Sequence, residues 1–238
     1  MTVGLFGGTF DPVHLGHLDV VRAARQALDL DVIWLVPART PPHRRPPHAS
    51  AAHRFAMAAL ATQVETGVLV SDLEMETSGP SYTAATLDRL ESRGWNLRNF
   101  CFVIGADAFR EIEAWRDYPR VLDRCDFAVV SRPGMPVSEL RRTLPALAGR
   151  MVEIPPGRPA SATATAARQA SILLVDVPTS PVSSTDVRSA IVRGASLEGL
   201  LPAVIADYIA RHGLYQNTRE GHESGKEPHE DTATPPAS

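Results

Sequence analysis

The sequence predicts an α/β fold, a Rossmann-like open parallel sheet with helices on both faces. Short apolar runs rich in β-branched residues alternate with longer stretches of helical periodicity, which is the pattern of βαβ units. The polar motifs follow the ends of the apolar runs, where open sheets of this kind bind their ligands. The expected strands are residues 2–6, 31–36, 68–73, 100–104, 127–130 and 172–175. The expected helices are residues 15–28, 51–66, 82–93, 108–112, 184–193 and 202–212.

The length and composition of the chain predict one domain. With 238 residues, of which 44% are hydrophobic, the chain can bury one good-sized α/β core, which we assign to residues 1–215. Residues 155–171 are rich in small side chains and lack periodicity, so we expect a flexible surface insertion there. Residues 216–238 have almost no apolar side chain, which predicts a disordered polar tail without a catalytic role.

Charge and cysteine usage narrow the class of partner. The net charge of −3 argues against a nucleic-acid interface, which needs a concentrated basic excess. No stretch approaches the roughly 18 apolar residues needed to span a membrane, and the N-terminus lacks a signal-peptide pattern. Cys101 and Cys125 lie in or beside apolar runs without metal-binding spacing, which indicates buried thiols in a reducing compartment. We therefore expect a cytoplasmic protein that acts on small molecules; its oligomeric state, a homo-oligomer included, stays open.

The first expected strand leads into the most informative segment of the chain. Residues 7–17 read Gly-Gly-Thr-Phe-Asp-Pro-Val-His-Leu-Gly-His and connect this strand to the first expected helix. The glycines allow a positive φ and a close approach of an anion, while the helix N-terminus offers free N–H groups and a positive dipole end. The segment therefore predicts a phosphate site, with His14 and His17 as N–H donors on one helix face.

Other kinds of site share some of these residues. A histidine pair at a helix start is also typical of a solvated cap, and its spacing also suits zinc, although no Cys or His cluster supplies further ligands. The dinucleotide fingerprint G-x-G-x-x-G is absent, because the glycines stand at positions 4, 7 and 8. A Walker P-loop is excluded, because the only lysine of the chain is Lys226.

The helix expected at residues 184–193 begins with a second polar cluster. Residues 182–188 read Val-Ser-Ser-Thr-Asp-Val-Arg. Ser183, Ser184 and Thr185 offer hydroxyls at a helix N-terminus. One turn later, the Arg188 guanidinium can fork onto a polyphosphate. Helix capping alone would also explain the three hydroxyl residues.

These two segments resemble the two signatures of the H-x-G-H nucleotidyltransferases. The first looks like Gly-Gly-Thr-Phe-Asp-Pro-x-His-x-Gly-His and the second like Ile-Ser-Ser-Thr-x-Ile-Arg, with Val182 and Val187 as conservative replacements. The likeness covers roughly residues 2–215 and is closest to the bacterial nicotinate-mononucleotide adenylyltransferases. It implies the HIGH-type nucleotidyltransferase fold.

Two segments between the signatures imply a pyridine nucleotide as the acceptor. The Gly-Pro-Ser-Tyr-Thr turn that contains Tyr82 and Thr83 resembles the family segment that approaches the nicotinate carboxylate and ring. After the fourth strand comes Ile-Gly-Ala-Asp, followed by Trp115. The family places this Asp, here Asp107, on the nucleotide ribose and stacks the pyridine ring on the tryptophan. Without the resemblance, a position in the hydrophobic core would explain Trp115 equally well.

Two further loops carry basic residues. Residues 40–44 resemble the family's Pro-Pro-His-Lys loop, so His43 and Arg44 are expected to contact phosphate at the acceptor side. The contact of Arg44 stays open, because a planar guanidinium binds differently from the compact ammonium that it replaces. The Ser-Arg-Pro-Gly turn after the fifth strand matches a family turn near the adenine and brings in Arg132, although a plain turn also explains its proline and glycine.

The resemblance implies attack of the 5′-phosphate of nicotinate mononucleotide on the α-phosphorus of ATP. The products are nicotinate adenine dinucleotide and pyrophosphate, in a step of NAD biosynthesis. No general base is needed, because a second pKa of about 6 leaves this phosphate largely dianionic. The sequence offers no convincing nucleophile arrangement, so we expect direct in-line transfer. Mg²⁺ is expected to arrive as Mg·ATP, because no carboxylate cluster suggests a dedicated metal site.

The resemblance assigns the predicted site residues to three roles, and Arg188 to two of them. Those assigned to catalysis are His14, His17 and Arg188. Those assigned to ATP are Gly7, Gly8, Thr9, Phe10, Gly105, Asp107, Arg132, Ser183, Ser184, Thr185 and Arg188. Those assigned to nicotinate mononucleotide are His43, Arg44, Tyr82, Thr83 and Trp115.

Other functions fit part of the sequence. Pantetheine-phosphate adenylyltransferase shares both end signatures, but the Gly-Pro-Ser-Tyr-Thr segment and the pairing of Asp107 with Trp115 favour a pyridine nucleotide. A non-catalytic nucleotide sensor would keep the fold, but the intact His14, His17 and Arg188 favour an enzyme. A purely structural role would leave the convergence of helix N-termini unexplained. The degree of preference for nicotinate over nicotinamide stays open.

Overall fold

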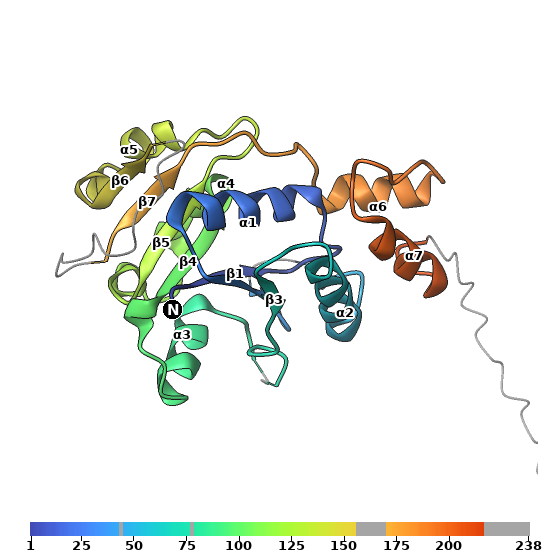
Figure 1. Ribbon diagram of the computed structural model, residues 1–238, viewed down its shortest axis with the longest axis horizontal. Coiled ribbons are helices and arrows are strands. Elements are labelled where there is room, and N and C mark those ends of the chain that lie inside the picture. Colours follow the sequence, from blue (N-terminus) through green and yellow to red (C-terminus); the bar gives the residue numbers. More distant parts are fainter. Residues whose placement is uncertain (43–44, 77–78, 156–169, 217–238) are drawn as a thin grey trace, which may run out of the picture.

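A sheet of seven parallel strands forms the centre of the computed structural model, which describes residues 1–42, 45–76, 79–155 and 170–216 (Figure 1). The strand order is β3-β2-β1-β4-β5-β7-β6. The strands are β1 (Val3–Gly8), β2 (Val32–Pro37), β3 (Val68–Val70), β4 (Phe100–Gly105), β5 (Asp126–Val130), β6 (Met151–Ile154) and β7 (Ile172–Val175). The predicted fold class is confirmed.

Helices connect the strands and cover both faces of the sheet. The α-helices are α1 (Leu15–Leu28), α2 (Ala51–Thr62), α3 (Thr83–Ser92), α4 (Ala106–Phe109), α5 (Leu140–Thr143), α6 (Ser184–Val192) and α7 (Ala203–Arg211). Short 3-10 turns are η1 (Leu97–Asn99), η2 (Ile112–Ala114), η3 (Arg120–Asp123), η4 (Val137–Glu139) and η5 (Pro145–Arg150). Figure 1 shows α1 above the sheet and α3 below it.

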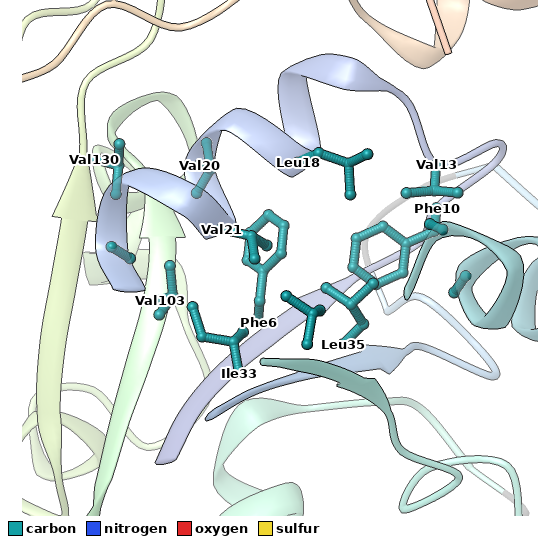
Figure 2. Close-up of a cluster of buried hydrophobic side chains, with 14 of the residues drawn as sticks. Phe6, Phe10, Val13, Leu18, Val20, Val21, Ile33, Leu35, Val103 and Val130 are labelled. Carbon is teal, nitrogen blue, oxygen red and sulfur yellow. The ribbon is translucent and has the colours of Figure 1, made fainter. Parts of the chain in front are cut away.

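The central strand β1 contributes side chains to the hydrophobic cores on both faces of the sheet. Its side chains alternate between the two faces, so that Leu5 packs in the core on the α3 side and Phe6 in the core on the α1 side. Figure 2 shows Phe6 and Phe10 beneath α1, close to Leu18 and Val21 of that helix. The rings of Phe6 and Phe10 meet edge to face, with centroids 5.6 Å apart. Phe10 is 1% exposed, so its ring anchors the turn after β1 in the core.

The order of the strands places a crevice beside β1. From β1 the chain first builds outward through β2 and β3, and it then returns to add β4 on the other side of β1. The connections that leave β1 and β4 therefore diverge at the carboxyl ends of these two strands. Open α/β sheets bind ligands at such a switch point.

Several predicted boundaries are wrong, and strand β6 was not predicted. Val152 and Glu153 of β6 are both exposed, so this edge strand shows no apolar alternation to detect. The third strand ends at Val70 instead of residue 73, because a turn closes between Asp72 and Met75. The second helix ends at Thr62 instead of residue 66, and Gly67 then takes a φ of +73° before β3 begins.

The predicted helix at residues 108–112 is instead the pair α4 and η2. Helix α5 and four of the 3-10 turns, η1, η3, η4 and η5, were not predicted, because such short elements carry no clear period. The predicted insertion and tail fall largely on residues 156–169 and 217–238, outside the described residues. Cys101 and Cys125 are buried free thiols, as expected. In the described ranges, no helix is both long and apolar enough to cross a membrane.

A buried guanidinium holds the turn after β1 against the neighbouring connection. Arg54 of α2 is 1% exposed and donates to the carbonyls of Thr9 and Ala38, each at 2.7 Å. It also donates to the carbonyls of Arg39 at 3.0 Å and Ala49 at 3.2 Å. Burial lowers the pKa of the guanidinium, and the charge of Asp11 opposes this shift. The side chain therefore joins the ends of β1 and β2 to the start of α2.

Asp11 completes this network from within the turn. Its buried carboxylate accepts from the backbone N–H of His48 at 2.7 Å and of Ala49 at 3.0 Å. The hydroxyl of Tyr215 donates to the same carboxylate at 2.8 Å. The turn is thus tied to the start of α2 and to the segment after α7.

Replacing Arg54 by Met should lower the free energy of unfolding by about 3–5 kcal/mol, because four buried or partly buried backbone carbonyls would lose their donor and the buried Asp11 carboxylate would lose a nearby positive charge. Arg93→Met is the matched control, since Arg93 pairs with Glu76 on the surface and should contribute less than about 1 kcal/mol. Urea unfolding of the three proteins measures both values. Equal losses in the two variants would contradict this role of Arg54.

Candidate active site

A cavity of about 510 Å³ opens at the carboxyl ends of β1 and β4. Its wall combines the turn after β1, the start of α3, the start of α4 and the chain around Trp115. The predicted site residues that line it are Gly7, Gly8, Thr9, Phe10, His17, Tyr82, Thr83, Gly105, Asp107, Trp115, Arg132 and Ser184. The structure therefore brings both ends of the predicted site to one cavity.

Other predicted site residues lie elsewhere. His14 and Ser183 are beside the cavity without lining it. Thr185 and Arg188 line a second cavity, of about 640 Å³, together with His48, Arg193 and Tyr215. His43 and Arg44 lie outside the described residues.

The glycines at the end of β1 are extended, so the expectation that they take a positive φ is wrong. The positive φ of this turn belongs to Phe10, at 51°. Gly8 is needed for a different reason: a Cβ there would lie 2.7 Å from the buried ring of Phe10. The glycine thus lets the phenylalanine ring fold back beneath the strand end. The absence of a Cβ also leaves the strand end open to an anion in the cavity.

His14 and His17 form a stacked pair at the start of α1. His14 is the N-cap residue of the helix, and the two ring centroids lie 3.7 Å apart with planes inclined by 32°. The backbone N–H of His14 donates to Nδ1 of His17 at 3.3 Å, so that nitrogen carries no proton. A neutral His17 therefore has its proton on Nε2, which makes Nε2 the donor. The rings of Phe10 and His17 meet edge to face with centroids 5.1 Å apart, and this contact orients the imidazole.

His14 is buried, with 2% exposure, so the interpretation as a solvated cap is wrong for this residue. Burial, followed by the charge of Arg132, lowers the pKa of His14 to about 3. The imidazole is therefore neutral near pH 7 and acts as a hydrogen-bonding group rather than as a cation. Its Nδ1 atom is buried without a hydrogen-bond partner in the described parts of the chain.

Arg132 and Gly16 join the first turn of α1 to the chain before α6. The guanidinium of Arg132 donates to the carbonyl of Gly16 at 2.9 Å and to that of Val182 at 3.4 Å. A Cβ on Gly16 would lie 2.8 Å from the Val182 carbonyl oxygen, which is a backbone atom and cannot easily move. The glycine between the two histidines is therefore required by a close approach of two segments far apart in the sequence.

The N-terminus of α6 packs against the turn after β1. Ser183 is the N-cap and accepts from the backbone N–H of Asp186 at 3.1 Å, so capping explains this hydroxyl. The Ser184 hydroxyl lines the cavity and donates to the Pro12 carbonyl at 2.9 Å. Arg188 donates to the Asp11 carbonyl at 2.6 Å and to the Thr185 hydroxyl at 3.1 Å. The N-termini of α1 and α6 thus meet at one turn.

The start of α3 forms the opposite wall of the cavity. Tyr82 is the N-cap of this helix, and no side-chain hydrogen bond caps it. The buried carboxyl of Glu74 also lines the cavity, where the Thr86 hydroxyl donates to it. Burial raises the pKa of Glu74, and bonds from Ser81 and Thr86 oppose this shift. Trp115 is half-buried and meets Phe102 edge to face, with centroids 6.0 Å apart.

Sequence reasoning missed several residues that build the site. Arg54 could have been found as a charged residue within an Ala-rich helix. Gly16 could have been found as a glycine that stands between the two histidines of the motif. Arg116 directly follows Trp115, a predicted site residue, and this adjacency was its signal. Glu74 carried no such signal, because only the fold brings it to the cavity. As for zinc, no group of three His, Cys, Asp or Glu side chains that could hold a metal occurs among the described residues.

Comparison with known proteins gives a consistent result. Residues 5–190 match the cytidylyltransferase-like family model. The chain is 38% identical over 216 residues to a probable nicotinate-nucleotide adenylyltransferase of Bordetella petrii, covering 90% of this chain and 98% of the relative. A relative with the same description from a Roseiflexus species is 37% identical over 215 residues, covering 90% and 98%.

The fold also resembles that of a solved structure. This is the nicotinic acid mononucleotide adenylyltransferase of Plasmodium falciparum complexed with NaAD, with a TM-score of 0.67 and 17% identity. The match covers 90% of this chain and 97% of the other. At this identity the likeness supports the fold alone.

The burial of His14 predicts a pH dependence of stability. The unfolded chain takes up a proton near the ordinary pKa of 6.5, whereas the folded protein takes it up only near pH 3. Stability is therefore lost as the pH falls below 6.5. Relative to His14→Gln, the wild-type protein should lose about 2 kcal/mol between pH 6.5 and pH 5.

Urea unfolding at the two pH values measures this difference. His212→Gln is the control, because it removes an exposed histidine that lies outside the cavity. A difference between wild type and His14→Gln that stays constant with pH would contradict a buried, neutral His14.

Proposed function

The chain belongs to the nicotinate-nucleotide adenylyltransferase family within the cytidylyltransferase-like proteins, and we propose that it transfers the adenylyl group of ATP to nicotinate mononucleotide. The products are nicotinate adenine dinucleotide and pyrophosphate, in a step of NAD biosynthesis. One observation carries the proposal: the N-termini of α1 and α6 converge beside a cavity whose opposite wall holds Tyr82 and Trp115. Helix N-termini bind phosphates, and the aromatic side chains on the opposite wall offer a flat surface to the pyridine ring.

The acceptor phosphate attacks the α-phosphorus of ATP directly. A phosphate monoester near neutral pH is largely dianionic, since its second pKa is about 6, so no base has to remove a proton. The Ser184 hydroxyl donates to the Pro12 carbonyl, and the Ser81 hydroxyl lies against Glu74 and the Thr40 backbone. Both serines at the cavity are thus engaged in the structure, which favours direct transfer over a covalent intermediate.

Catalysis then consists of holding two phosphates in line and neutralising charge on the α-phosphate and on the leaving pyrophosphate. Nε2–H of His17 donates to a phosphate oxygen in the transition state, while the neutral His14 orients the ring of His17 by stacking on it. The backbone of the turn after β1 and the N-terminus of α1 hold the polyphosphate. For Arg188, which already donates to Asp11 and Thr185, the remaining N–H groups of the guanidinium serve this role.

Mg²⁺ enters as part of the substrate, Mg·ATP. Phosphate oxygens and water supply most of its ligands, as is usual for Mg²⁺ that is bound with a nucleotide. The remaining cavity residues bind the nucleotides: Gly105, Asp107 and Arg132 on the ATP side, and Tyr82, Thr83 and Trp115 on the acceptor side. We place the reaction in the cytoplasm, where free thiols such as Cys101 and Cys125 persist.

Purified protein with Mg·ATP and nicotinate mononucleotide should release pyrophosphate and form nicotinate adenine dinucleotide. His17→Ala should lower turnover by about 10²–10³-fold, the usual cost of one preorganised donor to transition-state charge. The control is His53→Ala, which removes a histidine that contacts Tyr208, outside the cavity. Urea unfolding shows whether both variants stay folded.

Two results would count against the proposal. A turnover of His17→Ala near that of the wild type would remove His17 from the mechanism. Wild-type protein that forms no dinucleotide from either nicotinate or nicotinamide mononucleotide would refute the function and would favour a nucleotide sensor. Turnover of pantetheine phosphate instead would favour the other adenylyltransferase.

A further inference from the structure

We propose that the Arg116 side chain selects the acceptor by pairing its guanidinium with the pyridine carboxylate of nicotinate mononucleotide. The inference rests on the proposed function and adds a specificity-determining residue to it. Arg116 lines the cavity, and its Cζ atom lies 5.0 Å from the centroid of the Tyr82 ring.

This cation–π contact bridges two connections of the sheet. Tyr82 stands at the start of α3, between β3 and β4, whereas Arg116 follows η2, between β4 and β5. An exposed cation–π contact is weak, so it orients the guanidinium without using up its N–H donors. Among the described residues no ion pair involves Arg116. Its charge therefore remains available to a ligand in the cavity.

Two sources of positive potential meet at this wall. The N-terminus of α3 presents the backbone N–H groups of its first turn, beginning with Thr83, and no side chain of Tyr82 caps them. The Arg116 guanidinium lies over the ring of that same Tyr82. Glu74, Asp107 and Glu111 are the acidic residues that line this cavity. Burial raises the pKa of Glu74, which reduces its repulsion of an anion. The first turn of α3 and the Arg116 guanidinium thus offer a carboxylate two positive partners at one place in the cavity.

The substrate carries two anionic groups, and the fold separates their sites. The phosphate belongs with His17 and the N-terminus of α1, which come from the connection after β1. Arg116 is the neighbour of Trp115, whose indole offers the flat surface for the pyridine ring. A carboxylate on that ring lies beside the guanidinium. A nicotinamide ring in the same place offers only a neutral amide and gains no ion pair.

The test compares two acceptors that differ only at this group. Arg116→Gln should lower kcat/KM for nicotinate mononucleotide about tenfold, the scale of one charge-assisted hydrogen bond at a partly solvated site. The value for nicotinamide mononucleotide should stay within about twofold. Arg116→Lys should recover part of the loss, because it keeps the charge but not the planar fork. Arg120→Gln is the matched control, since this exposed arginine lies outside the cavity.

The outcomes separate the competing explanations. An equal loss for both acceptors would mean that Arg116 contacts the shared phosphate or only supports the fold, and it would overturn the proposal. No loss for either acceptor would overturn it as well. Calorimetric binding of each mononucleotide provides a readout without turnover. If the wild type binds both acceptors but makes no dinucleotide, the proposed function fails, whereas a nicotinate preference that Arg116→Gln abolishes would still support the role of Arg116.

Discussion

The site depends on one constraint, the fixing of the turn between β1 and α1 by two buried charges. Arg54 holds the Thr9 carbonyl from α2, and Asp11 within the turn binds the backbone of His48 and Ala49. Backbone N–H groups stabilise developing charge only where they are preorganised. In an exposed, unrestrained turn, the entropy cost of ordering the backbone would offset part of the free energy of phosphate binding.

The same turn joins the two helix N-termini to which we assign the phosphates. The Asp11 carbonyl accepts from Arg188, and the Pro12 carbonyl accepts from Ser184. On the other side, Arg132 links the first turn of α1 to the chain before α6. Because these contacts converge on a few residues, contacts within the protein itself hold the two N-termini at their spacing. The residues that we assign to the acceptor, at the start of α3 and around Trp115, lie in other connections of the sheet. Changes in their sequence therefore need not disturb the turn between β1 and α1.

Periodicity and motifs in the sequence predicted the architecture, whereas tertiary contacts decided the details. The bounds of α1 and of β7 agree with those expected, because both elements have clear periods and flanking breaks. Strand β6 escaped prediction because it is short and half exposed. The sequence placed Gly16 within its motif, but only the fold shows the Val182 carbonyl that leaves no room for a Cβ. The burial of His14 likewise follows from packing that no local pattern encodes.

The proposed direct transfer of the adenylyl group to the acceptor phosphate is best tested by stereochemistry. ATP that is chiral at its α-phosphorus, with sulfur in place of one non-bridging oxygen, would be converted with nicotinate mononucleotide to the thio-substituted dinucleotide. A single in-line displacement predicts inversion of configuration at the α-phosphorus. Retention would contradict direct transfer, because it requires two displacements through an adenylylated side chain of the protein.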